Sequence, residues 1–194
     1  VFTMSLSKRQ NIFLIFALSA IMWLTRGHHV ASLAHLPDAS WAIFFIVGFY
    51  CSSFAVIALF LAQAFLIDYL ALTQLGMGQS CFTLAYSFLL PAYLSLWFAG
   101  KCLSKRAELS LTGFKSFVIA AVSGIIVCEL ISSGSFYFIN VPGTASLAEF
   151  MGRFAQYLPH ALMFTMSYLL VALVAHLVFT ATAQKAAARS KINL

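Results

Sequence analysis

Residues 41–75 read WAIFFIVGFYCSSFAVIALFLAQAFLIDYLALTQL, an apolar run of 35 positions with a single acidic residue. About 20 helical residues are enough to cross a hydrocarbon core of about 30 Å. The run can therefore form one long tilted helix or two shorter helices. The choice between these two arrangements decides the topology of the whole chain.

The composition indicates that the bilayer is the solvent of this protein. Of its 194 residues, 62% are hydrophobic and only 8% are charged, whereas soluble proteins carry roughly 25% charged residues. These values exclude a soluble globular protein. We expect residues 1–194 to form a single transmembrane domain, since no polar stretch is long enough for a separate one. The net charge of +6 then sets the orientation in the membrane and does not indicate a nucleic-acid partner.

The distribution of Lys and Arg favours a hairpin for residues 41–75. Nine of the eleven basic residues fall in three clusters, and such clusters collect on the cytoplasmic side of membrane proteins. If all three are cytoplasmic, the run must cross an even number of times, with a turn near residues 48–53. Together with the apolar runs at 11–24, 82–100, 116–131 and 158–183, this predicts an all-α integral membrane protein with six transmembrane helices and both termini cytoplasmic. The clusters are Lys8 and Arg9; Lys101, Lys105, Arg106 and Lys115; and Lys185, Arg189 and Lys191.

One cysteine on the predicted external side has a setting that suits chemistry. Cys81 ends the stretch Gly-Met-Gly-Gln-Ser-Cys and enters the next apolar run. Small residues allow a bulky ligand to approach the backbone, and a helix N-terminus favours the thiolate, which binds metals and attacks electrophiles. An inert buried cysteine is an equally good interpretation of the same residues.

Asp68 and Tyr86 are further candidates on that side. Asp68 lies inside an apolar run, where an ionisable group costs at least ~2.5 kcal/mol on insertion scales. It therefore either serves a ligand pocket or ties helices together as a protonated or Arg-paired carboxyl. Tyr86 can reach the same pocket as a hydrogen-bond donor or acceptor, or act as an interfacial aromatic residue.

Cations and histidines also collect at the external side. Arg26, His28 and His29 follow the first apolar run, but adjacent histidines point in different directions and chelate a metal poorly. Arg153 can pair with Glu149 one helical turn earlier or with an anionic ligand group. No zinc-binding spacing is present, so we expect no structural metal held by the protein.

Four features of the sequence carry a resemblance to a known family. They are Leu24-Thr-Arg-Gly-His-His29, Leu36-Pro-Asp-Ala-Ser-Trp41, Asp68, and Gly78-Gln-Ser-Cys81 with Tyr86. In these features, and over nearly its whole length, the chain resembles the BtuM family. Members of that family are small bacterial inner-membrane proteins, similar to the substrate-binding S-components of ECF-type vitamin transporters.

The resemblance implies cobalamin, vitamin B12, as the ligand and an S-component-like bundle as the fold. Cys81 would be the axial ligand of the cobalt, a role that suits a soft, strongly donating thiolate. It would replace the vitamin's own base, giving base-off binding and removal of cyanide from cyanocobalamin, with Asp68 and Tyr86 also catalytic. The other expected ligand contacts are Arg26, His28, His29, Gln79, Ser80 and Arg153.

Two other functions stay open at the level of sequence. One is an S-component for a different small vitamin, in which Cys81 has no chemical role. The other is an accessory protein that organises membrane subunits, in which the ionisable groups only tie helices together. The sequence also leaves open whether the chain works alone or with an ECF energising module of two ATPases and a transmembrane subunit, because docking surfaces of small residues look like ordinary helix packing.

Overall fold

The computed structural model describes residues 7–26, 36–51, 53–75, 83–106, 108, 110–141, 143 and 145–192, with side chains left out at 74, 75 and 183–192. Over these residues the fold is all-α, as predicted. The elements are α1 (Lys8–Arg26), α2 (Ser40–Tyr50), α3 (Phe54–Leu75), the 3-10 helix η2 (Leu84–Phe88), α4 (Leu89–Ser104), α5 (Leu111–Asn140) and α6 (Leu147–Ile192).

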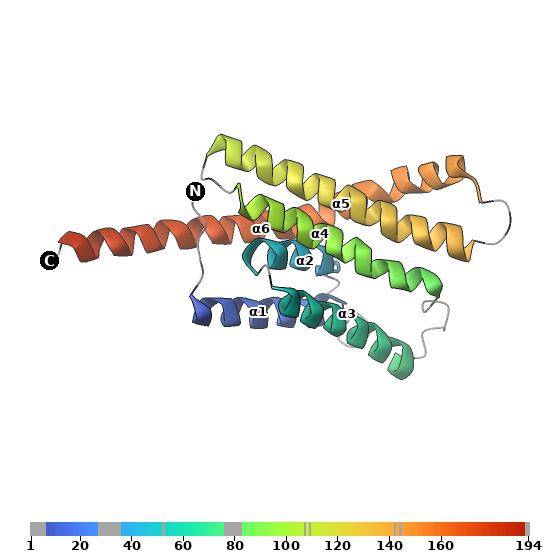
Figure 1. Ribbon diagram of the computed structural model, residues 1–194, viewed down its shortest axis with the longest axis horizontal. Coiled ribbons are helices and arrows are strands. Elements are labelled where there is room, and N and C mark those ends of the chain that lie inside the picture. Colours follow the sequence, from blue (N-terminus) through green and yellow to red (C-terminus); the bar gives the residue numbers. More distant parts are fainter. Residues whose placement is uncertain are drawn as a thin grey trace.

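The run 41–75 is divided as the hairpin prediction requires. Helix α2 ends at Tyr50 and α3 begins at Phe54, so the break between them lies within the turn predicted near residues 48–53. Helices α1, α3 and α5 run in one direction along the bundle, and α2, α4 and α6 return in the other (Figure 1). The start of α1, the α4–α5 connection and the end of α6 therefore share one end of the molecule. Described basic residues at this basic end are Lys8, Arg9, Lys101, Lys105, Arg106 and Lys115.

Among the residues that the structure describes, three helices are long and apolar enough to cross a membrane: α3 over Phe54–Thr73, α5 over its full length, and α6 over Leu147–Thr182. Helix α2 is apolar but has only 11 residues, about 16 Å at the α-helical rise. It therefore spans only about half of a typical hydrocarbon core. These features indicate a multi-pass membrane protein.

The apolar runs predicted at 116–131 and 158–183 are shorter than the helices that contain them. Helix α5 continues to Asn140, and α6 begins at Leu147. The serines around residue 133 suggest a loop, yet the Ser135 hydroxyl donates to the carbonyl of Ser132 at 2.9 Å. A side chain that bonds to its own helix in this way does not need water, so the helix continues.

Serine side chains define where three helices begin. Ser7 and Gln10 form a reciprocal capping box at α1, in which each side chain accepts from the other's backbone N–H, at 3.3 Å and 2.8 Å. Ser110 accepts from the N–H of Gly113 at the start of α5, at 3.1 Å. Ser146 caps α6 in the same way. These caps satisfy donors that a helix start otherwise leaves open.

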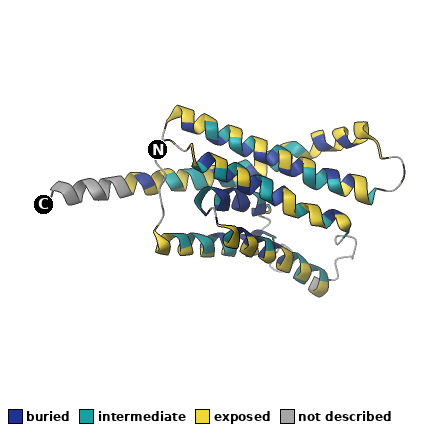
Figure 2. Ribbon diagram, viewed as in Figure 1, coloured by how far each residue is buried: buried dark blue, intermediate teal, exposed yellow. Residues whose placement is uncertain are grey.

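The short helix α2 forms the centre of the bundle, and the other helices surround it (Figure 2). It crosses α4 very closely. A Cβ added at Gly48 would lie 2.0 Å from the carbonyl oxygen of Trp97, and one added at Gly100 would lie 2.0 Å from that of Phe45. Only glycine allows the two backbones to approach this far.

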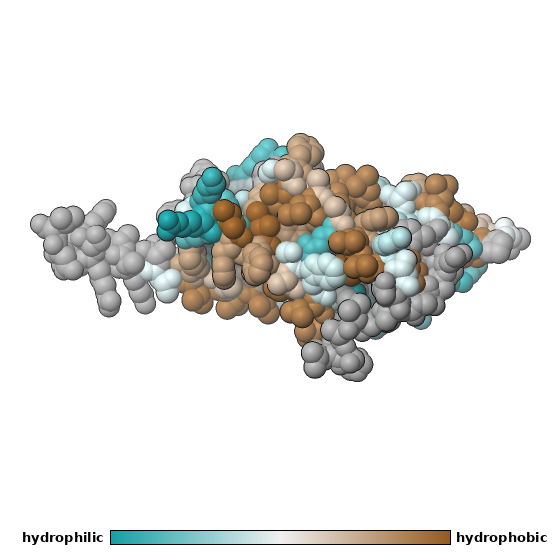
Figure 3. Space-filling view, turned by 90° about the horizontal axis from the view of Figure 1, so that it is seen from below, coloured by the Kyte–Doolittle hydropathy of each residue, from teal (hydrophilic) through white to brown (hydrophobic). Residues whose placement is uncertain are grey.

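The outer surface is apolar. Phe13 and Phe16 on α1 and Leu111 on α5 are each more than 70% exposed, and hydrophobic residues cover the middle of the face seen in Figure 3. The most hydrophilic residues of that face gather toward the end from which α6 leaves the bundle. An exposed apolar surface of this kind is in contact with the lipid bilayer.

Candidate functional site

A partly buried ion pair joins the end of α1 to α3, and these helices end opposite the basic end (Figure 1). Arg26, the last residue of α1, donates from Nε to Asp68 Oδ1 at 2.7 Å and from Nη2 to Asp68 Oδ2 at 2.6 Å. The side chains of Arg26 and Asp68 are only 9% and 23% exposed. This two-point geometry is the strongest form of an Arg–carboxylate contact.

The third nitrogen of Arg26 connects two more elements to the pair. Nη1 donates to Asp38 Oδ2 at 3.2 Å, to Ser40 Oγ at 3.0 Å and to the Tyr93 hydroxyl at 2.8 Å. Asp38 in turn accepts from the backbone N–H and the hydroxyl of Ser40, at 2.9 Å and 2.6 Å. The cluster thus holds the start of α2 and the middle of α4 against α1.

Tyr86 completes the cluster from η2. Its hydroxyl donates to Asp68 Oδ2 at 2.8 Å. Three of the residues singled out in the sequence, Arg26, Asp68 and Tyr86, are therefore brought together by the fold. We call the six residues Arg26, Asp38, Ser40, Asp68, Tyr86 and Tyr93 the Arg26 cluster.

The pairing limits what Asp68 can do chemically. Both of its carboxylate oxygens accept from Arg26, and Oδ2 also accepts from Tyr86. Because donors already occupy both oxygens, this carboxylate is a poor candidate for a free general base. The sequence left two roles for Asp68, a group in a ligand pocket or a carboxyl that joins helices by pairing with an arginine. In the structure Asp68 pairs with Arg26, and it also positions the Tyr86 hydroxyl.

Neighbouring contacts fix the segment that carries Asp38. The Tyr168 hydroxyl on α6 donates to the carbonyl of Pro37 at 2.7 Å. The N–H of Ala39 donates to the Thr25 side chain at 3.2 Å. Residues 37–40 are therefore attached to α1 and α6 as well as to the Arg26 cluster, which makes the cluster a junction of the whole bundle at this end.

Asp38, Ser40 and Tyr93 were not among the predicted site residues. A signal for Tyr93 was present, because it follows Tyr86 by seven positions, two helical turns, and so shares its face. The sequence also offers a signal for Ser40, which follows Asp38 by two residues just before an apolar run. An aspartate side chain commonly accepts a hydrogen bond from the backbone N–H two residues later. The partner that unites them, Arg26, lies far away in sequence and could not be assigned to them from local patterns.

Arg153 has other partners. It donates to Glu149 Oε1 from Nε at 3.1 Å and from Nη2 at 2.8 Å, and its guanidinium carbon lies 5.5 Å from the centre of the Tyr137 ring. The Tyr137 hydroxyl donates to Glu149 Oε2 at 3.0 Å. Of the two predicted alternatives for Arg153, the structure therefore shows the pairing with Glu149. Together with Tyr137, this pair connects α5 to α6.

Glu129, on α5, is an acidic residue that is fully buried, at 6% exposed. It accepts a short hydrogen bond from the Ser133 hydroxyl one turn later. This bond gives the carboxyl a local partner within its own helix. Glu129 therefore stays apart from the Arg26 cluster in its hydrogen bonding.

The remaining predicted site residues, Cys81, Gln79, Ser80, His28 and His29, lie outside the described residues. Their roles, including that of Cys81 as cobalt ligand, stay predictions. Within the part of the chain that the structure describes, no three His, Cys, Asp or Glu side chains gather as a metal site. In comparisons with known proteins, no family model and no curated protein sequence matches the chain.

Proposed function

We propose that this chain is a bacterial inner-membrane protein that binds cobalamin on its external side and takes it into the cell. The observation that carries the proposal is the convergence of the features on which the BtuM resemblance rests. Arg26, Asp38 with Ser40, Asp68 and Tyr86 come from four separate stretches of sequence, yet they form one hydrogen-bonded cluster. Residues that meet in this way are expected to serve one site.

The orientation follows from the charges. The Lys and Arg residues of the basic end face the cytoplasm under the positive-inside rule, which puts both termini inside and the Arg26 cluster at the external side. In this arrangement α1, the α2–α3 hairpin, η2 with α4, α5 and α6 supply six passages of an S-component-like bundle. The short α2 lies in the centre, where the longer helices shield its ends from lipid.

The proposed chemistry centres on Cys81. Its thiolate binds the cobalt of base-off cobalamin as an axial ligand and, as a strong donor, weakens the bond to the opposite axial group. When a reductant of the thiol class transfers one electron to cobalt(III), the cobalt–cyanide bond breaks and cyanide leaves with the bonding electron pair. Asp68, fixed by Arg26, holds the Tyr86 hydroxyl within the Arg26 cluster.

The visible spectrum of bound cyanocobalamin tests this proposal. The wild-type protein, purified with the vitamin, is expected to show a spectrum that differs from free cyanocobalamin and changes as cyanide leaves. Cys81→Ser should bind without this change, whereas Cys102→Ser, an exposed cysteine at the basic end, should behave as the wild type. An unchanged wild-type spectrum, or equal conversion by wild type and Cys81→Ser, would reject the thiolate model.

One observation favours a simpler second function. The charged groups of the Arg26 cluster are paired with one another, as expected if they only hold a binding subunit or an organising subunit together. The colour of the purified protein separates the vitamins: a red preparation indicates cobalamin and a yellow one a flavin. If the cluster has only a structural role, Asp68→Asn should reduce the yield of folded protein and leave the ligand affinity of the remainder unchanged.

Growth experiments test the partners. In a strain without other B12 uptake, the chain should support growth on cobalamin. Removing the ATPases of an ECF energising module shows whether the protein depends on such a module or works alone. Purification of the chain with two ATPases and a transmembrane subunit would identify the assembled form.

A further inference from the structure

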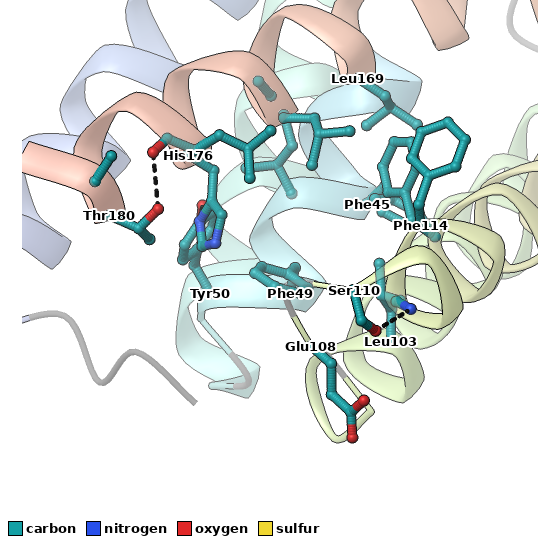
Figure 4. A pocket seen from close by; sticks show the side chains of 17 residues that line it. Phe45, Phe49, Tyr50, Leu103, Glu108, Ser110, Phe114, Leu169, His176 and Thr180 are labelled. Carbon is teal, nitrogen blue, oxygen red and sulfur yellow. Dashed lines mark hydrogen bonds between the residues drawn. The ribbon is translucent and has the colours of Figure 1, made fainter. Parts of the chain in front are cut away.

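A cavity of about 540 Å³ lies between α2, α5 and α6, next to the last turn of α4. Its apolar lining includes Phe45 and Phe49 from α2, Phe114 and Phe117 from α5, and Leu169 and Leu173 from α6 (Figure 4). Its volume falls within the range of about 300–1,000 Å³ that is typical of small-molecule sites. It includes Leu103, near the basic end, and is thus separate from the Arg26 cluster.

Four polar side chains of the wall, those of Tyr50, Ser110, His176 and Thr180, already form hydrogen bonds. The Tyr50 hydroxyl and His176 Nδ1 lie 2.5 Å apart in a hydrogen bond, and Thr180 Oγ1 donates to the carbonyl of Leu177 at 2.8 Å. Ser110 accepts from the N–H of Gly113. A polar solute would lose its hydration here and gain few hydrogen bonds. The cavity therefore suits an apolar occupant.

Exposed cations lie close in sequence to lining residues at the basic end. Lys105 and Arg106 follow α4 two and three residues after the lining residue Leu103, and Lys115 follows the lining residue Phe114. Against these three cations stands one carboxylate, Glu108, which extends away from the aromatic rings at the edge of the cavity (Figure 4). The excess of positive charge favours an anionic group beside an apolar chain.

We propose that this cavity binds one acyl chain of an anionic phospholipid, whose headgroup lies against Lys105, Arg106 and Lys115. Lipid is the amphiphile in contact with the outer surface of the bundle, and its two parts match the two parts of the site. The apolar wall receives the chain, and the cations at the basic end receive the phosphate. The site is independent of any vitamin bound at the opposite end.

Native mass spectrometry of the protein released from lipid nanodiscs tests the proposal. From discs of phosphatidylglycerol the wild type should retain one lipid, and from discs of phosphatidylcholine it should retain about tenfold less. Ala172→Phe fills the cavity and should abolish the retained lipid. The matched control is Ala58→Phe, which adds the same volume at an exposed position of α3 outside the cavity. Leu173→Trp provides a second cavity-filling variant if Ala172→Phe does not fold.

The headgroup contact has its own pair of variants. Lys105→Gln with Arg106→Gln should remove the preference for phosphatidylglycerol, whereas Lys8→Gln with Arg9→Gln, at the same end on α1, should keep it. Equal retention of the two lipids by the wild type would overturn the proposal. The proposal would also be overturned if the cavity-filling variants retained as much lipid as Ala58→Phe. It would likewise be overturned if the wild type formed a dimer that the cavity-filling variants dissociate.

Discussion

The guanidinium of Arg26 holds both carboxylate oxygens of Asp68, at 2.7 Å and 2.6 Å, although the two residues are 42 positions apart. The contact joins α1 to α3, which run parallel and are linked a second time by Ser19 and Gln63, whose side chains bond at 2.9 Å. A charge pair at one end and a neutral polar pair in the middle thus fix the register of the two helices.

Removal of one partner of the Arg26–Asp68 pair should strongly destabilise the protein. Asp68→Asn or Arg26→Gln leaves a buried charge with reduced compensation, for which we expect a loss of about 3–5 kcal/mol in the free energy of unfolding. Thermal unfolding in mild detergent measures this loss. Arg153→Gln is the control, because Arg153 and Glu149 are about half exposed and their pair should have little effect. Equal shifts for both arginines would contradict the assignment of Arg26 as the bundle's junction.

Tyr86 and Asp68 should show energetic coupling. Tyr86→Phe removes the donor at 2.8 Å from Asp68 Oδ2, and a hydrogen bond to a charged group contributes about 1.5–3 kcal/mol. In a double-mutant cycle with Asp68→Asn, the effect of Tyr86→Phe should become much smaller. Tyr86→Phe paired with Glu129→Gln provides the control, since Glu129 bonds to Ser133 instead. Additive effects of Tyr86→Phe and Asp68→Asn would argue against the bond.

The crossing of α2 and α4 should not tolerate a methyl group. Gly48→Ala or Gly100→Ala places a Cβ 2.0 Å from a backbone oxygen, so the two helices must separate, at a cost of at least about 1–3 kcal/mol. Gly152→Ala is the matched control within α6, where an added Cβ meets nothing within 4 Å and improves helix propensity by about 1 kcal/mol. Unfolding midpoints of the three variants should therefore shift in opposite directions. A stable Gly48→Ala protein would exclude the close crossing.

Cysteine labelling tests burial and orientation together. In a Cys81→Ser background, a membrane-impermeant maleimide should label Cys102, which is exposed beside Lys101, from the cytoplasmic side. Cys51 and Cys128 are buried and should label slowly. Burial also raises the pKa of the Cys51 thiol in the α2–α3 turn, so less reactive thiolate is present at neutral pH and its labelling should rise only at higher pH. Labelling of Cys102 from outside the cell would reverse the proposed orientation.

The pattern of apolar runs and charges predicted much of the fold. The break of residues 41–75 into two helices followed from the positions of Lys and Arg alone, because the membrane restricts the chain to helices that cross it in alternating directions. The ends of α5 and α6 were predicted less well, since serines and the charged pair Glu149–Arg153 resemble a loop in sequence. In the structure these side chains bond within or between the two helices, which therefore extend further.

The candidate site was only partly predictable for a similar reason. Asp68 stands out in sequence because a charge in an apolar helix must be compensated, but its partner could have been a ligand, a proton or any of several cations. The packing of α1 beside α3 selected Arg26, and the position of η2 then brought Tyr86 to the same carboxylate. Neither choice is visible in local sequence, because each depends on the register between helices far apart in the chain.

The amino-acid sequence by itself determined that this protein is helical, lies in a membrane and has a basic end, because composition and charge act through the solvent and do not depend on which helices touch. Only the tertiary structure decided that Arg26 pairs with Asp68, that Gly48 and Gly100 allow α2 to lie in the centre, and that a cavity remains between α2, α5 and α6. These features arise from contacts a few ångströms long between distant segments, and such contacts exist only once the helices are packed.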